Sequence, residues 1–232
     1  MRVALISVGD EILSGDTVNT NASWLAERLT EAGATVARIT VVPDDVSEIA
    51  RVVNEYRATY AAVIVTGGLG PTHDDLTMEA VAAAFGTELA ADEEVKRWLT
   101  ESGGYSGDDL APGTTHIPER AEMLANPEGV APGCAIENVY VLPGVPSEMR
   151  AMFELIADEF GGQKRHRTVV EAVEPESQLL DRVREVQEKF GVKVGSYPGE
   201  HVRLQIQSTD EAAVAAAADW LRERVELPAA EN

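Results

Sequence analysis

The sequence predicts an α/β protein: a three-layer α/β/α domain with a mostly parallel sheet, followed by a small α+β domain of βαββα order. Over the first two thirds of the chain, short segments rich in β-branched residues alternate with helix-like segments. This alternation is typical of parallel sheets with helices on both faces. Over the last third, the order changes to strand, helix, strand, strand, helix. We therefore expect one domain at residues 1–163 and a second at residues 164–232, divided within the segment 161–167.

Hydrophobic patterning and capping residues predict the N-terminal elements. Residues 3–8 are almost continuously apolar, as strands buried on both faces are. A helix is expected at residues 22–32, with Asn21 as its N-cap and Gly33 just past its end. The alternation continues with an expected strand at 35–42, a helix at 46–60 and a strand at 61–65.

The middle of the chain begins with a helix that should run from Thr72 to the residue before Gly86. The Thr72 hydroxyl lies three residues before Asp75, which is the spacing of a capping box. The polar, glycine-rich segment 102–113 predicts a long loop or a lid. The other elements expected in this domain are a helix at 92–101, strands at 134–136 and 139–142, and a helix at 146–160.

The second domain is expected to hold one strand with a clear alternating pattern, at residues 202–208. Val202, Leu204 and Ile206 should face the core, and the polar residues between them should face solvent. The remaining expected elements are a strand at 168–172, a helix at 175–190, a strand at 192–196 and a helix at 211–224.

The charge of the chain limits its partners. The formal net charge is −21, because 40 acidic residues face 19 basic ones, of which 15 are arginine. Such a surface repels nucleic acid and anionic membranes, so we expect neither as a partner. The acids are spread along the chain. They indicate either an acidic interaction face or adaptation of the whole surface to a salt-rich cytoplasm.

Cysteine content and hydropathy point to a cytoplasmic protein. Cys134 is the single cysteine, so no disulfide can form within the chain, and its apolar neighbours predict a buried small residue rather than a nucleophile. No apolar run approaches the roughly 18 residues that cross a membrane. The chain opens directly on an expected strand, so we expect no signal peptide.

The most informative segment reads TGGLGPTHDDLT, from Thr66 to Thr77. Its glycines lie between an expected strand and an expected helix, where they let the backbone approach a ligand and where a helix N-terminus favours anions. Asp74 and Asp75 lie in the same segment. A carboxylate repels a nearby phosphate by roughly 4 kcal/mol per charge pair at an effective dielectric of about 20, and a divalent cation between them reverses this. The segment predicts a metal-assisted phosphate or pyrophosphate site, although a tight structural turn would also use these glycines.

Five motifs, in this order, resemble the molybdopterin-binding (Mog/MoaB-like) domain family, in the branch found at the N-terminus of competence/damage-inducible protein A (CinA). The resemblance covers about residues 1–160. The motifs are SVGDEILSG at 7–15 with VNTN at 18–21, VVPDD at 41–45, TGGLGPTHDDLT at 66–77, NPEGVAPG at 126–133 and LPGVPSEM at 142–149.

The resemblance implies that Asp44 and Asp75 are catalytic, since they match the acids implicated in the similar pterin enzymes. Each also follows an expected strand end by a few residues, so one sheet edge could bring them together. Their role would be to hold Mg²⁺ or a similar cation, which polarises a phosphoryl oxygen or activates a water. Acids at helix N-termini are the alternative interpretation, and we favour it for Asp45 and Asp74.

Further site residues are expected in three groups. Backbone amides and hydroxyls of the glycine segment should contact a phosphate or pterin: Thr66, Gly67, Gly68, Gly70, Thr72 and Thr77. The loop after the first strand should add ligand contacts from Gly9 and Asn19, metal ligands from Asp10 and Glu11, and an amide of Asn21 at a ring edge, unless Asn21 serves only as a cap. A stiff loop before a helix could hold another anion through Pro143, Gly144 and Ser147.

The resemblance also implies an activity. CinA-type relatives are associated with divalent-metal-dependent hydrolysis of pyrophosphates such as ADP-ribose, and a similar domain linked to FAD synthesis hydrolyses FAD. We expect Mg²⁺, Mn²⁺ or Co²⁺ as cofactor, with K⁺ as a further candidate, and a molybdopterin or nucleotide as ligand. Relatives form dimers or trimers, which implies self-association. A molybdopterin adenylyltransferase-like enzyme and a non-catalytic binding module remain as alternatives.

Overall fold

A computed structural model describes residues 1–70, 72, 75–101, 113–162 and 165–228. The chain divides into two compact units, Met1–Gly162 and Gln163–Asn232. The prediction for Asp74 and nearly all of the predicted loop at 102–113 lie outside the described residues.

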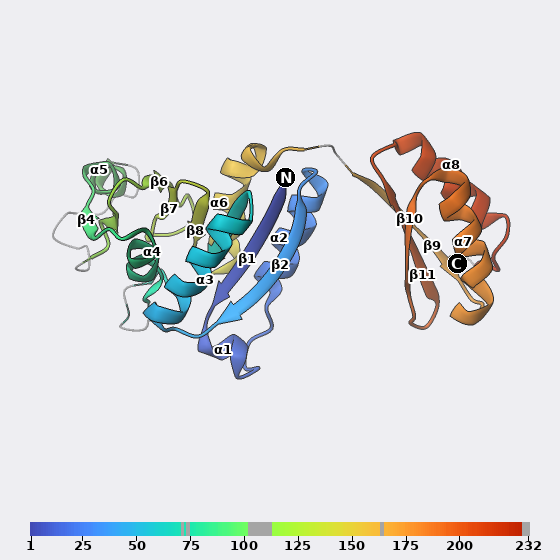
Figure 1. Ribbon diagram of the computed structural model, residues 1–232, viewed down its shortest axis with the longest axis horizontal. Coiled ribbons are helices and arrows are strands. Elements are labelled where there is room, and N and C mark those ends of the chain that lie inside the picture. Colours follow the sequence, from blue (N-terminus) through green and yellow to red (C-terminus); the bar gives the residue numbers. More distant parts are fainter. Residues whose placement is uncertain (71, 73–74, 102–112, 163–164, 229–232) are drawn as a thin grey trace. The chain divides into compact units, whose positions relative to one another are not determined.

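The first unit is built on a six-stranded sheet of order β2-β1-β3-β8-β7-β6 (Figure 1). β2, β1, β3 and β8 are parallel neighbours, and β7 and β6 continue the sheet antiparallel. The sheet is therefore mostly parallel, as predicted. Its strands are β1 (Arg2–Val8), β2 (Thr35–Val42), β3 (Ala62–Thr66), β6 (Glu122–Leu124), β7 (Gly133–Ile136) and β8 (Val139–Leu142).

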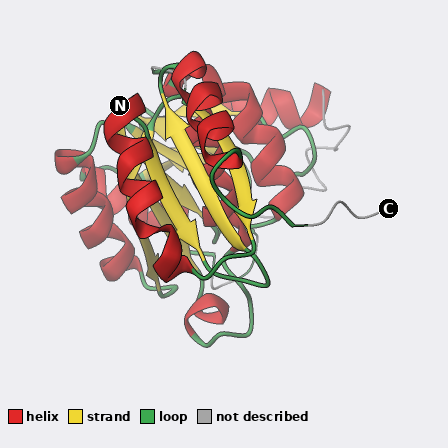
Figure 2. Ribbon diagram, turned by 90° about the vertical axis from the view of Figure 1, so that its right-hand side faces the viewer, coloured by secondary structure: helices red, strands yellow, loops and turns green. Residues whose placement is uncertain are grey.

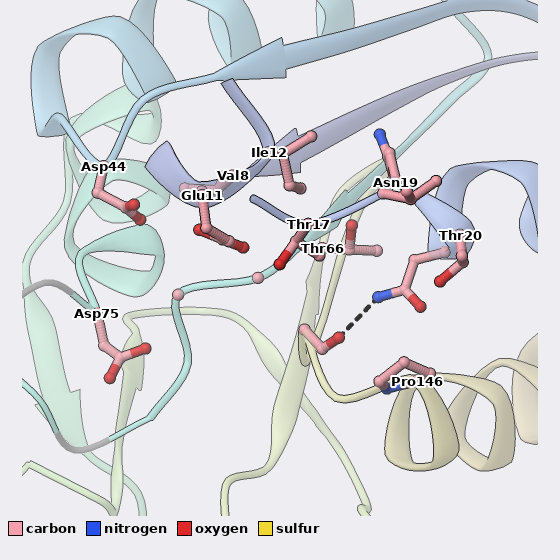
Figure 3. Close-up of a pocket in the computed structure, with 16 residues that line it drawn as sticks. Val8, Glu11, Ile12, Thr17, Asn19, Thr20, Asp44, Thr66, Asp75 and Pro146 are labelled. Atoms are coloured by element: carbon pink, nitrogen blue, oxygen red, sulfur yellow. Dashed lines mark hydrogen bonds between the residues drawn. The ribbon is translucent and has the colours of Figure 1, made fainter. Parts of the chain in front are cut away.

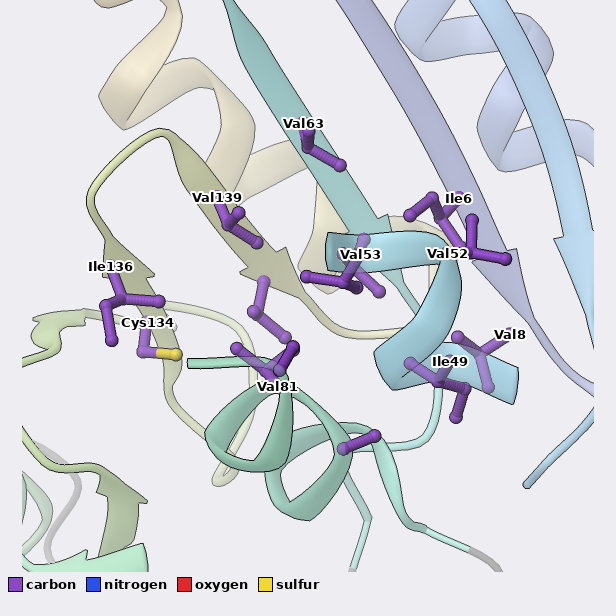
Figure 4. Close-up of a cluster of buried hydrophobic side chains, with 14 of the residues drawn as sticks. Ile6, Val8, Ile49, Val52, Val53, Val63, Val81, Cys134, Ile136 and Val139 are labelled. Atoms are coloured by element: carbon purple, nitrogen blue, oxygen red, sulfur yellow. The ribbon is translucent and has the colours of Figure 1, made fainter. Parts of the chain in front are cut away.

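Helices cover both faces of this sheet and complete the three layers. On one face, Ile6 and Val8 of β1 pack with Ile49 and Val53 of α3 (Val46–Thr59) and with α4 (Thr77–Phe85) (Figure 4). On the other face, the alternate β1 residues pack with α2 (Thr20–Glu31) and α6 (Pro146–Ile156). The remaining elements of this unit are α1 (Asp10–Leu13), β4 (Leu89–Ala91), α5 (Glu93–Glu101), β5 (His116–Pro118) and the 3-10 helix η1 (Ala157–Phe160).

Two predicted helix starts are wrong, and local hydrogen bonds explain both. The helix expected from Thr72 begins at Thr77, because Thr72 and Asp75 close a turn upon themselves before it. The helix expected after Asn21 begins at Thr20 instead, since the side chain of Asn19 caps it by accepting the N–H of Ala22. The short elements α1, β4, β5 and β6 were not predicted.

The second unit has the predicted βαββα order. Its three antiparallel strands are arranged β10-β11-β9, and Val202, Leu204 and Ile206 are buried in its core. Figure 2 shows the helices in red beside the strands in yellow. The elements are β9 (His166–Ala172), α7 (Glu176–Phe190), β10 (Lys193–Tyr197), β11 (Val202–Ser208) and α8 (Glu211–Arg222).

Across the described residues, no helix is both long enough and apolar enough to cross a bilayer.

Candidate functional site

A pocket of about 280 Å³ lies in the first unit, where the parallel strands end (Figure 3). Ligands of open α/β sheets bind at this edge because the loops after parallel strands converge there. The segment from the end of β1 to the first turn of α2 contributes Val8, Gly9, Glu11, Ile12 and the run from Thr17 to Asn21. The end of β3, the first residue of α6 and the loops after β2, β3 and β8 contribute Asp44, Thr66, Gly67, Gly68, Asp75, Gly144 and Pro146.

The glycine segment forms the part of the pocket next to β1. Gly67 has φ +104°, and a Cβ there would lie 2.3 Å from the carbonyl oxygen of Val8. Only glycine fits so close an approach of two backbones. The Gly67 amide donates to the carbonyl of Leu142 at 3.2 Å, and the Gly9 amide donates to Val42 at 3.1 Å. Neither amide is therefore a ligand donor, although the sequence predicted donor amides in the glycine segment and a ligand contact at Gly9.

The carboxylates of Asp44, Asp75 and Glu11 line the same pocket (Figure 3). Asp44 Oδ2 accepts the backbone N–H of Asp10 at 2.9 Å. Asp75 Oδ2 accepts the N–H of Thr72 at 2.9 Å and its hydroxyl at 2.5 Å. These hydrogen bonds fix the orientation of both carboxylates, although each lies on a loop. The expectation that one sheet edge brings Asp44 and Asp75 together agrees with this geometry.

The donor set fits a hard cation that shares its coordination with a ligand. Carboxylate oxygens are the ligands that Mg²⁺ and Mn²⁺ prefer. Within the described ranges, however, no group of three or more acids, histidines or cysteines is placed to hold a metal ion. The four acids expected as metal ligands therefore do not form a ready-made cage. Mg²⁺ commonly takes one or two carboxylates and completes its shell with water and substrate phosphates, which this pocket would allow.

Asn19 lies on the side of the pocket away from the two aspartates (Figure 3), and Asn21 lines the same pocket. Asn19 is held by the fold: its Nδ2 donates to Ser7 Oγ at 3.0 Å and its Oδ1 caps α2. Asn21 Nδ2 donates to the carbonyl of Gly144 at 2.7 Å, and this bond joins the first turn of α2 to the loop after β8.

Six of the predicted site residues do not line the pocket. Asp10 and Thr72 are hydrogen-bonded instead to the carboxylates of Asp44 and Asp75. Gly70 lies beside the Asp75 carboxylate, and Thr77 is fully buried beneath Gly68. Pro143 is buried and Ser147 is exposed, outside the lining set.

Several lining residues were not among the predicted site residues: Val8, Ile12, Thr17, Val18, Thr20 and Pro146. Their signal was weak, because apolar and hydroxyl side chains in a loop carry no charge pattern. Asp45 is the N-cap of α3 and accepts the N–H of Glu48, which agrees with the structural role favoured for it.

Comparison with known proteins identifies the family of this unit. The family model described as "Probable molybdopterin binding domain" matches residues 4–161, more than half of the chain. The chain belongs to the molybdopterin-binding domain family. A second family model, described as "FAD synthase, middle domain", matches residues 164–230.

Relatives confirm the CinA branch of the molybdopterin-binding domain family. A CinA-like protein of Geobacter sp. (strain M21) is 37% identical, over 97% of this chain and 58% of its own. A protein of Thermococcus kodakarensis is 40% identical over 97% of each chain. The crystal structure of CinA from Thermoplasma acidophilum, whose function is described as unknown, has 38% identity and a TM-score of 0.63, covering 68% of this chain and 97% of that one.

Proposed function

We propose that this molybdopterin-binding domain protein is a divalent-metal-dependent nucleotide pyrophosphatase, acting on substrates of the ADP-ribose or FAD type. The observation that carries the proposal is the convergence of Asp44, Asp75 and Glu11 with the glycine segment in one pocket. The match of the second unit to a domain of FAD synthase also favours a nucleotide-related role.

The acids and the glycine segment would have different roles toward a pyrophosphate: the acids would bind the cation, and the glycine segment would contact the phosphoryl oxygens. Asp44 and Asp75 would hold the cation, and Glu11, which lines the same pocket, would bind one of its waters. When bound, the cation would polarise a phosphoryl oxygen and lower the pKa of a bound water. The backbone at Gly68 and the hydroxyl of Thr66 would contact the phosphoryl oxygens, and two loops fixed by hydrogen bonds would keep this arrangement without reorganisation.

The test compares the wild type with Asp44→Asn and Asp75→Asn, incubated at high KCl with ADP-ribose or FAD and with Mg²⁺, Mn²⁺ or Co²⁺. Release of AMP is measured. We expect metal-dependent turnover that falls at least about 100-fold in either variant, because losing a few kcal/mol of charge stabilisation has this effect. Asp158→Asn is the matched control, since Asp158 is exposed on η1 at the far end of α6.

Other outcomes would select other functions. Metal-independent turnover, or variants as active as the wild type, would remove the proposed roles of Asp44 and Asp75. Adenylyl transfer from ATP to a pterin, without pyrophosphate hydrolysis, would favour an adenylyltransferase. Tight binding of nucleotide or pterin without any turnover would leave a binding module.

A further inference from the structure

The side chain of Asn21 has one atom that the fold leaves unsatisfied. Its Nδ2 donates to the Gly144 carbonyl at 2.7 Å (dashed line in Figure 3). A carbonyl oxygen can only accept, so the nitrogen of the Asn21 amide must face it and the oxygen must face elsewhere. That oxygen, Oδ1, is buried and meets no donor among the described residues. Buried polar atoms in native proteins nearly always have a partner.

Asn21 lies in a pocket, where a ligand can supply this partner. Asn21 lines the same pocket as Asp44 and Asp75, but its bond to Gly144 lies near Thr20 and Pro146, on the side away from the two acids (Figure 3). The side-chain amide of Asn19 also lines the pocket, but both of its polar atoms bond within the fold: Nδ2 donates to Ser7, and Oδ1 accepts from the N-terminus of α2. The pocket thus has an acidic side and, separately, a neutral acceptor.

We propose that Asn21 Oδ1 accepts a hydrogen bond from an amino group on the heterocyclic base of a nucleotide ligand. The inference rests on the proposed function, in which the phosphates lie toward Asp44 and Asp75. The substrates of that proposal, ADP-ribose and FAD, both carry adenine, and the 6-amino group of adenine would supply this donor. A base without this donor would bury the acceptor unpaired, which costs affinity beyond the loss of a contact.

The test measures binding and does not depend on hydrolysis. Calorimetry compares ADP with purine riboside 5′-diphosphate, which differs only in lacking the 6-amino group. For the wild type we expect ADP to bind about 10- to 100-fold more tightly. In Asn21→Ala the two probes should bind with equal affinity. Loss of the Gly144 bond would weaken both probes alike, so the affinity ratio reports on Oδ1 alone. Asn54→Ala, at an exposed asparagine of α3, should keep the wild-type ratio.

Three results would overturn the inference: equal binding of both probes by the wild type, an unchanged ratio in Asn21→Ala, or no binding of ADP. Failure of the proposed function looks different. If the wild type and Asn21→Ala show the expected ratios but AMP is never released from ADP-ribose or FAD, the pyrophosphatase is excluded and the base contact stands.

Discussion

Replacement of Gly67 by alanine should destabilise the first unit strongly, for two separable reasons. At φ +104° an L-residue is strained, at a cost of about 1–3 kcal/mol. The new Cβ would also lie 2.3 Å from the backbone oxygen of Val8, which cannot swing away as a side chain can. Forcing a methyl group into a packed site costs about 1–3 kcal/mol more. Gly67→Ala should therefore lower the free energy of unfolding by about 2–6 kcal/mol.

Gly86 provides the matched control. It ends α4 with φ +63°, and a Cβ there meets nothing within 4 Å. Gly86→Ala should thus cost only the left-handed strain, about 1–2 kcal/mol. Both substitutions restrict the unfolded chain equally, so the difference between them reports the collision with Val8 together with the larger backbone strain at φ +104°.

The assay must report on the first unit alone, because two units need not unfold together. Trp220 lies in the second unit, whereas Trp24 and Trp98 lie in the first. In a Trp220→Phe background, tryptophan fluorescence during urea unfolding therefore follows the first unit. If Gly67→Ala and Gly86→Ala lowered its stability by the same amount, the close approach of Gly67 to Val8 would be refuted.

Three further predictions concern burial and capping. Burial raises the pKa of the Cys134 thiol to about 12, so Ellman's reagent should label it at pH 8 only after unfolding; rapid labelling of native protein would contradict this. Phe153 is fully buried and packs its ring on Trp24 and Phe160, so Phe153→Ala should cost about 3–5 kcal/mol in the same fluorescence assay, and a loss below 1 kcal/mol would be inconsistent with that packing. The Ser47 hydroxyl and the Glu48 N–H lower the pKa of Asp45 below 3.8, so the carboxylate stabilises the fold above pH 3.8 and this stabilisation is lost as pH falls through the lowered pKa. Asp45→Asn should therefore reduce the loss of stability in acid, and an unchanged dependence of stability on pH would argue against this role of Asp45.

Long, periodic elements could be predicted from the sequence, and short ones could not. The strands at 35–42, 139–142 and 202–208 were predicted with the bounds that they have, because each carries an apolar pattern over four or more residues. β4, β5 and β6 have three residues each, too few for a period, and are strands only because of their antiparallel neighbours. The start of α4 was missed because Thr72 and Asp75 satisfy each other in a turn instead of capping the helix.

For the site, the sequence by itself determined which residue types are available: acids, glycines and amides in loops that follow strands. Only the tertiary structure decided which of their atoms remain for a ligand. The amide of Gly67 is taken up by Leu142, and one end of Asn21 by Gly144, although these partners are far apart along the chain. Such bonds depend on the order in which the strands lie side by side. The order of the strands cannot be predicted from local sequence patterns, because the periodicity of a strand or helix is the same whichever element packs beside it.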